Sequence, residues 1–294
     1  MTNWAQVLFN SAVTGSLYLL SAVALTLTYG LSRFPNFAHA EFMALGAYVG
    51  YFISAQLHLP FVVCILFAFL ASGILGLMSY KGIFGPLSRR GSSLIHLMIA
   101  SMALGFIARY VIAEIWGWAP LSFSIIWPAY DIGPVRASAV WLLPIITALL
   151  AGVSMHFVLT RTKIGKAIRA TASNPQLAMA SGINTGRVLL TVWFLSAGLA
   201  GIAGLFRGAS TRLSPLMGWD ILLPVFAVTV LGGIGSFYGA IVAAFIIGLA
   251  ENIGVVILNQ FGLSTDYRMA VSFVILIVVL LIKPEGLTRL FKGN

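Results

Sequence analysis

The sequence predicts an all-α polytopic membrane protein in which residues 1–294 form a single transmembrane domain. Hydrophobic residues make up 60% of the chain and charged residues 8%, and the mean hydropathy is +1.01. Soluble domains contain about 25% charged residues, so a soluble fold could not bury this much apolar surface. The apolar runs, such as residues 12–27 and 271–282, are nearly continuous, whereas strands of a membrane β-barrel alternate polar and apolar residues. We therefore expect helical spans.

Glycine, proline and charged residues separate the apolar runs and define about nine expected spans, within a range of about 8 to 10. A crossing needs about 20 apolar residues, so the run 221–234 is too short to cross alone. We expect a broken or re-entrant helix there, with its break at Gly232, Gly233 and Gly235. The expected spans are residues 8–30, 37–56, 60–80, 94–116, 139–160, 187–207, 221–234, 238–258 and 268–283.

The basic residues predict the orientation of these spans. A net charge of +10 would suggest nucleic-acid binding in a soluble protein, but here the charges gather in a few loops, so we expect no nucleic-acid partner. Loops rich in Lys and Arg face the cytoplasm, and nine spans then place the N-terminus outside and the C-terminus inside. The cytoplasmic side receives Arg33, Lys81, Arg89, Arg90, Arg161, Lys163, Lys166, Arg169, Arg187, Lys283, Arg289 and Lys292. The external side receives Arg109, Arg136, Arg207, Arg212 and Arg268.

The sequence indicates neither a metal site nor an enzyme. Cys64 is the only cysteine, and His39 has no second His or Cys nearby, so a metal ion would lack ligands. Gly165-Lys166 has neither the upstream glycine nor the following Ser or Thr of a phosphate-binding loop. We expect that this chain does not hydrolyse ATP by that chemistry.

Residues 161–186 form the long polar stretch expected on the cytoplasmic side. Ser173 or Asn174 can cap a helix that begins at Pro175, and Gly182 can end this helix in the left-handed conformation. Such a helix could sit in a groove of another protein, or the stretch could be a basic loop that only fixes topology. The small, apolar face of the helix would consist of Leu177, Ala178 and Ser181.

The same stretch follows the pattern T-x-x-G-x-A-x-R-A, then N-P, then A-x-x-x-G-I-N. The matching residues are Thr162, Gly165, Ala167, Arg169, Ala170, Asn174, Pro175, Ala178, Gly182, Ile183 and Asn184. This resembles the cytoplasmic coupling loop of the branched-chain amino acid ABC transporter permease family, the LivH and LivM type, and is closest to the LivH-like subunit. In that family the loop docks onto a separate ATP-binding subunit, which the resemblance implies for residues 161–186.

Two further segments resemble the same family, in the expected order along the chain. The run NFAHAEFMALGAY, which ends at Tyr48, is similar to the family signature N-F-A-H-G-E-F-M-x-L-G-A-Y, except that Ala40 stands where the family usually has glycine. The run from Leu231 to Glu251 is similar to G-G-x-G-S-x-x-G-A followed by a glycine-containing helix and Glu. The resemblance therefore covers nearly the entire chain.

Several glycines recur at the spacing of helix contacts. Gly46 and Gly50, and Gly235 and Gly239, have the GxxxG spacing that lets helices approach closely. A third set, at positions 198, 201 and 204, recurs every third residue. We expect close helix packing at these sites, and hinge motion is the alternative.

Charged residues within the spans are candidates for function because each costs about 2.5–3.5 kcal/mol at a helix centre on insertion scales. We expect Glu41 in the first turn of a helix capped by Asn36, Glu114 near the external end with Arg109 in reach, and Glu251 inside a span beside Asn252. Glu41 and Glu251 can act in the pathway or serve packing. The candidate pathway or gating residues are Asn36, His39, Glu41, Gly232, Gly233, Gly235 and Glu251.

The resemblance also implies a function. It implies the permease of a type II ATP-binding cassette importer, in a bacterial or archaeal inner membrane, for branched-chain or other neutral amino acids. The implied partners are two ATP-binding subunits that hold ATP and Mg, a second homologous permease in a heterodimer, and an external solute-binding protein, with no cofactor on this chain. Alternatives are a permease of this family for urea or short amides, and an ion-gradient-driven secondary transporter using carboxylates such as Glu41 and Glu251.

Overall fold

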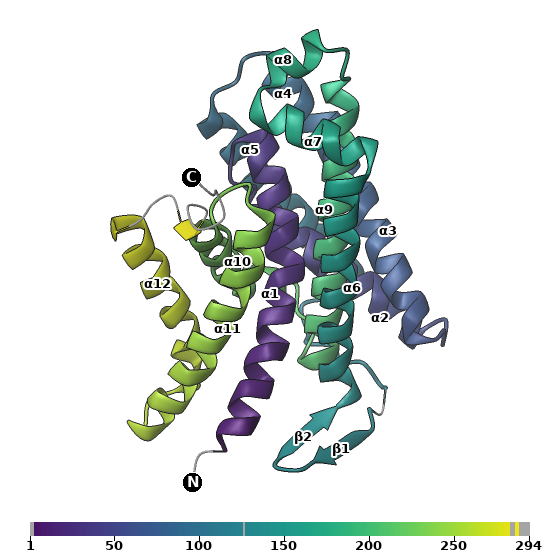
Figure 1. Cartoon of the computed structure of the whole chain (residues 1–294). Helices are drawn as coiled ribbons and strands as arrows, with labels where there is room; N and C mark the ends of the chain where they lie inside the picture. Colours follow the sequence, from purple (N-terminus) through teal and green to yellow (C-terminus); the bar gives the residue numbers. More distant parts are fainter. Residues whose placement is uncertain (1–2, 126, 283–285, 288–294) are drawn as a thin grey trace.

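The computed structural model describes residues 3–125, 127–282 and 286–287, and most of this part of the chain is helical (Figure 1). A two-stranded antiparallel hairpin, β1 (Ala129–Ile132) with β2 (Val135–Ser138), lies at one end of the molecule. The helices are α1 (Trp4–Ser32), α2 (His39–Ala55), α3 (Phe61–Ser79), a π-helical turn (Tyr80–Phe84), α4 (Gly85–Arg89), α5 (Leu94–Trp116), α6 (Ala139–Arg161), α7 (Lys163–Ser173), α8 (Pro175–Ala180), α9 (Thr185–Ser210), α10 (Met217–Gly232), α11 (Phe237–Gln260), a 3-10 turn (Thr265–Tyr267) and α12 (Arg268–Ile282).

The predicted fold class and span positions are confirmed. Each of the nine expected spans coincides with a helix whose ends lie within four residues of the expected ones. Six helical segments of the described chain are long and apolar enough to cross a membrane, namely α1, α3 continued through α4, α5, α6, α9 and α11. The remaining three, α2, α10 and α12, are shorter, with 17, 16 and 15 residues.

Side chains next to the helix starts explain several of these boundaries. The Asn3 side chain accepts a hydrogen bond from a backbone N–H at the start of α1, as do those of Asn184 at α9 and Ser236 at α11. Each supplies an acceptor to an N–H group that has no partner within the helix. At the other end of α1, Arg33 adopts a left-handed conformation (φ 58°) and ends the helix.

The two ends of the molecule differ in charge. We call the end formed by α4, α7 and α8 the basic end, and the end that contains β1 and β2 the hairpin end (Figure 1). The basic residues expected in the cytoplasm lie on the elements that end or lie at the basic end, apart from Lys283, Arg289 and Lys292, which lie outside the described residues. The prediction for Arg109 is wrong, because this residue is buried inside the molecule (7% exposed).

α2 and α10 both begin about midway between the basic end and the hairpin end, a level that we call half depth. His39, the first residue of α2, contacts Ser21 in the middle of α1, with its Nε2 3.1 Å from the serine Oγ. A Cβ atom on Gly218, at the start of α10, would clash with the backbone of Ala40. The starts of α2 and α10 are therefore packed against one another, and the glycine is required for this approach.

The short span expected at residues 221–234 is only partly as predicted. α10 ends at the expected glycines, since Gly233 follows it with φ 90° and Gly235 has φ 80°. A second non-helical segment precedes α10. Residues 211–216 lead from the end of α9 back to half depth. The sequence signal had placed the break only at the glycines.

The helices form two sets with inverted directions. α1, α2, α3 and α5 follow one another as α9, α10, α11 and α12 do, and each helix of the first set runs opposite to its counterpart (Figure 1). The packing is inverted in the same way, because α3 packs on α9 as α11 packs on α1, and α2 packs on α3 as α10 packs on α11. Transporters commonly place their pathway between two such halves.

Glycines bring these helices into backbone contact, which confirms the predicted close packing. A Cβ atom on Gly46 of α2 would clash with the backbone of Gly201 on α9, and one on Gly204 would clash with the Met43 carbonyl. Gly232, at the end of α10, meets Gly239 of α11 in the same way. These contacts place α9 at the centre of the molecule, where its middle is fully buried.

Candidate functional site

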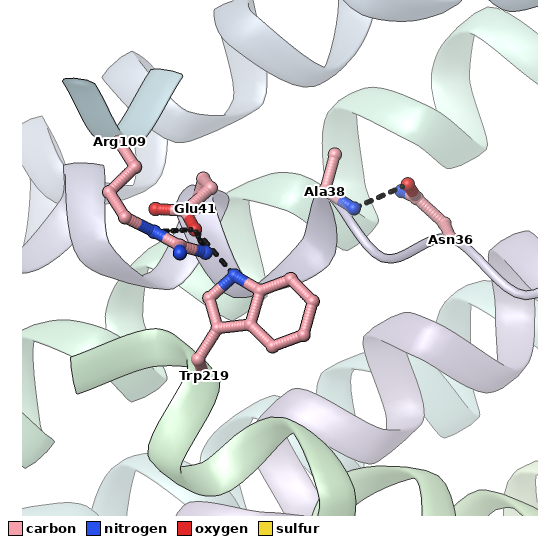
Figure 2. A network of polar contacts seen from close by, with 5 residues as sticks. All are labelled: Asn36, Ala38, Glu41, Arg109 and Trp219. Carbon is pink, nitrogen blue, oxygen red and sulfur yellow. Dashed lines mark hydrogen bonds and ion pairs between the residues drawn. The ribbon is translucent and has the colours of Figure 1, made fainter. Parts of the chain in front are cut away.

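A buried ion pair holds the half-depth junction together. Glu41, in the first turn of α2, accepts hydrogen bonds on Oε1 from Arg109 of α5 (Nη2 at 2.6 Å and Nε at 3.1 Å) and from Trp219 Nε1 of α10 (2.9 Å) (Figure 2). The carboxylate is 1% exposed, and the guanidinium lies 4.9 Å from the Trp219 ring and 5.5 Å from that of Phe106. Three helices are therefore joined through one carboxylate oxygen.

The structure corrects two expectations near this junction. Arg109 pairs with Glu41 rather than with Glu114, which is exposed. Asn36 is not the N-cap of α2, because the helix begins at His39 after Ala38. The Asn36 Oδ1 instead accepts from the Ala38 N–H (3.1 Å), and its buried Nδ2 has no hydrogen-bond partner (Figure 2).

Glu251 is the centre of a second buried polar cluster. It is 0% exposed, as expected for a residue inside a span, and its Oε2 accepts a hydrogen bond from the Tyr18 hydroxyl at 2.7 Å. Ser272 donates to its other oxygen, and Arg268 Nε lies 3.6 Å from Oε2. Asn252 beside it donates to Thr14 Oγ1 at 3.2 Å. The cluster connects α11 to α1 and α12.

A polar cavity of about 360 Å³ adjoins this cluster, where α1, α9, α10, α11 and α12 come together. Its charged lining residues are Arg207, Arg268 and Asp220, with Thr265 and the Tyr18 side chain beside them. Three apolar side chains complete the wall, namely Ile221, Val255 and Met269. Both charge signs and an aliphatic wall are thus present in one space, within the range of about 300–1,000 Å³ typical of small-molecule sites.

The Gly232, Gly233 and Gly235 turn lies away from this cavity, at the basic end. Gly235 N–H donates to Thr26 Oγ1 at 2.9 Å, and its Cα lies against Gly30 of α1. The turn therefore joins α10 and α11 and packs on α1. Of the expected pathway residues, Asn36, His39 and Glu41 lie together at the half-depth junction, while Glu251 belongs to the separate cluster.

The predicted cytoplasmic segment forms two helices at the basic end, α7 and α8 (Figure 1). Thr162 caps α7 by accepting from Gly165 N–H (3.1 Å), and a Cβ atom on Gly165 would clash with carbonyls at the end of α6. Asn174 caps α8 as expected, accepting from two backbone N–H groups at 3.0 Å, and Gly182 follows with φ 80°. Arg169 is exposed on α7.

The exposed face of α8 differs from the expected one. Leu177 is 64% exposed and Ser181 is exposed as predicted, but Ala178 is buried (3%) and faces the protein itself. Ile183 lies half-buried in the turn before α9. Met179, which the sequence pattern did not single out, is 54% exposed beside Leu177.

Sequence reasoning missed five residues of these clusters. Tyr18 and Ser272 lie in apolar runs and resemble ordinary span residues, and Asp220 and Arg207 were not considered as partners. Trp219 gave no signal either. The available signal was that Arg109 and Arg207 lie within helical runs, where a charge requires a partner.

Comparisons with known proteins agree with this architecture. The family model described as "Branched-chain amino acid transport system / permease component" matches residues 7–280. A probable branched-chain amino acid transport permease protein LivH of Methanocaldococcus jannaschii is 31% identical over 96% of this chain and 91% of its own length. A high-affinity branched-chain amino acid transport system permease protein LivH of Escherichia coli K12 is 29% identical over 96% of this chain and 94% of its own.

Among solved structures, PsaBC from Streptococcus pneumoniae in complex with Fab is similar in fold. The TM-score is 0.50 at 18% identity, and the match covers 100% of this chain and 96% of that one. This likeness supports the fold, while the family match over residues 7–280 identifies the group of proteins. The chain therefore belongs to the family of branched-chain amino acid transport permease components.

Proposed function

We propose that this chain is the membrane-spanning permease subunit of an ATP-binding cassette importer that moves branched-chain amino acids into the cytoplasm. The relatives bear the names of branched-chain amino acid permeases. The observation on this chain that supports the substrate class is the polar cavity beside Glu251, with both charge signs and an aliphatic wall. A zwitterion with a branched aliphatic side chain matches that lining.

The cavity suits an amino acid in each of its parts. Arg207 and Arg268 can pair with the α-carboxylate, Asp220 with the α-ammonium group, and the wall that contains Ile221 and Val255 can contact the side chain. Charges within a membrane protein are costly and are usually retained where they line a pathway. Urea and short amides are neutral and would not need a paired set of opposite charges. The lining thus favours the amino acid over the amide alternative.

The inverted halves offer a route for alternating access. α2 and α10 begin side by side at half depth, and they end at the hairpin end and the basic end respectively. A relative movement of the two halves would open the middle to one end at a time. We assign the basic end to the cytoplasm and the hairpin end to the exterior of a bacterial or archaeal inner membrane, because Lys and Arg gather on the cytoplasmic side.

The energy for this movement would come from partner subunits. Two ATP-binding subunits, which hold ATP and Mg, would dock on α7 and α8, whose Leu177 and Met179 side chains are exposed at the basic end. ATP binding would then favour one of two conformations, as coupling between two sites requires. A second, homologous permease in a heterodimer and an external solute-binding protein would complete the importer, with lipid around it and no cofactor on this chain.

The test is uptake of radiolabelled leucine by cells that lack this chain, with and without a plasmid copy. We expect the plasmid to restore uptake, excess isoleucine or valine to compete and urea not to compete. ATP depletion with the membrane potential maintained should abolish the restored uptake. Restored urea uptake instead of leucine uptake would refute the substrate, and uptake that survives ATP depletion would refute the energy source.

A further inference from the structure

A long groove is lined mainly by side chains of α1, α6 and α11. α1 packs against both α6 and α11 (Figure 1). The groove consists of two adjoining cavities that share Phe237 and Tyr238. The cavity at the basic end has a volume of about 620 Å³. The second cavity lies further from the basic end, has a volume of about 380 Å³, and is called the deeper cavity. The groove is distinct from the polar cavity beside Glu251, with which it shares no lining residue.

The deeper cavity is lined almost entirely by apolar side chains. They come from all three helices, for example Leu19 of α1, Leu149 and Val153 of α6, and Phe245 of α11. Along α6 the cavity extends from residue 145 to residue 156, which is about 16 Å at 1.5 Å per residue. The hydrocarbon core of a bilayer is about 30 Å thick. The cavity therefore has the length of one leaflet, starting from the basic end.

The cavity at the basic end has the opposite chemistry. Two arginines line it, Arg33 at the end of α1 and Arg169 on α7, together with Tyr29 and Thr160. Among the described residues, no Asp or Glu lines this cavity. Arginine binds phosphate oxygens through paired N–H groups. The amino end of α11, which begins at Phe237, also opens here and adds partial positive charge.

We propose that this groove binds one anionic phospholipid, with its phosphate between Arg33 and Arg169 and an acyl chain along the deeper cavity. The headgroup would lie where the basic end meets the membrane, and the chain would follow α1 towards half depth. A hydrogen bond between His156 Nδ1 and the Tyr238 hydroxyl (2.8 Å) joins α6 and α11 where the two cavities meet. This hydrogen bond holds α6 and α11 at a fixed distance beside the proposed acyl chain.

The position of Arg169 gives this lipid a role. Because α7 carries Arg169 and belongs to the segment proposed to receive the ATP-binding subunits, the phosphate would connect that segment to α1, which carries Arg33. The bound lipid would thus hold α7 against the membrane helices. Transport should then depend on the fraction of anionic lipid in the membrane.

The experiment is native mass spectrometry of the purified, delipidated chain with added phosphatidylglycerol or phosphatidylcholine. We expect preferential retention of one phosphatidylglycerol, reduced about tenfold in the double variant R33Q/R169Q. The matched control R89Q/R90Q removes two exposed arginines at the same end that do not line the groove, and it should retain the lipid. Equal retention of the two lipids, or retention unchanged in R33Q/R169Q, would overturn the proposal.

Further variants separate the other possible occupants. Gly152 lines the deeper cavity, and a Cβ atom there would meet nothing within 4 Å. Gly152→Leu should therefore fill the groove and weaken phosphatidylglycerol retention without changing the charge.

Two further outcomes would identify another occupant. Displacement of the lipid by millimolar inorganic phosphate would show a simple phosphate site. A Leu149→Cys side chain that cross-links to a second copy in membranes would show a protein interface. Either result would overturn the lipid assignment.

Discussion

Glu41 and Arg109, which are 68 residues apart in sequence, form an ion pair at 2.6 Å inside the molecule. The pair lies where α2 and α10 begin, and Trp219 donates to the same carboxylate oxygen. Because the carboxylate and guanidinium are almost fully buried, removal of one partner leaves the other as an uncompensated charge. The stability of this junction therefore depends on the pair as a unit.

Glu41→Ala should lower the free energy of unfolding by about 3–5 kcal/mol, the range for breaking a buried pair on one side. Removing both charges in Glu41→Gln with Arg109→Met should recover part of that loss. Denaturant titration of the purified protein measures both effects. Glu114→Gln, which removes an exposed carboxylate on α5, is the control and should change stability by less than about 0.5 kcal/mol. A double variant as unstable as Glu41→Ala would contradict this account.

Gly204→Ala should destabilise the chain because its Cβ would clash with the Met43 carbonyl on α2. Overpacking typically costs about 1–3 kcal/mol. We expect a cost near the upper limit of this range, because the neighbour is backbone and cannot move aside as a flexible side chain can. The matched variant Gly82→Ala adds the same methyl where nothing lies within 4 Å, so its stability should not fall. Thermal unfolding in detergent compares the two. Equal melting temperatures would mean that α9 and α2 do not need this close contact.

Leu177 and Ala178 are neighbours on α8 with opposite environments, 64% and 3% exposed. Leu177→Asp should leave the chain as stable as wild type but prevent copurification of the ATP-binding subunits and reduce leucine uptake at least tenfold. Ala178→Leu should instead destabilise the chain itself, because the larger side chain has no room. Affinity copurification and thermal unfolding distinguish these effects. Normal copurification of Leu177→Asp would exclude α8 as the docking element.

The sequence was sufficient for the parts of the structure that depend on local patterns. Apolar runs located the nine helices, and Asn174, Pro175 and Gly182 located α8, because caps and left-handed glycines act on adjacent residues. The glycine spacings also predicted helix contact, since a missing side chain allows approach whatever the partner.

The pairing of distant charges could not be predicted in this way. Glu251 and Tyr18 are 233 residues apart, and their contact depends on how α1 and α11 pack. Arg109 was assigned to the external side of the membrane, and nothing in the residues around it indicates Glu41 as its partner. Segment 211–216 contains Pro215, which can end a helix. The return of this segment to half depth nevertheless depends on how α10 packs against the start of α2, where Gly218 meets Ala40.

The most direct test of the proposed transport pathway is maximal leucine uptake by Arg207→Gln and Asp220→Asn in cells that lack the native chain. Each removes one charge from the polar cavity beside Glu251, and we predict at least a tenfold fall at saturating leucine with normal membrane abundance. Arg212→Gln, an exposed arginine outside the cavity lining, should transport as wild type. Wild-type uptake by both cavity variants would contradict the assignment of this cavity to the amino acid pathway.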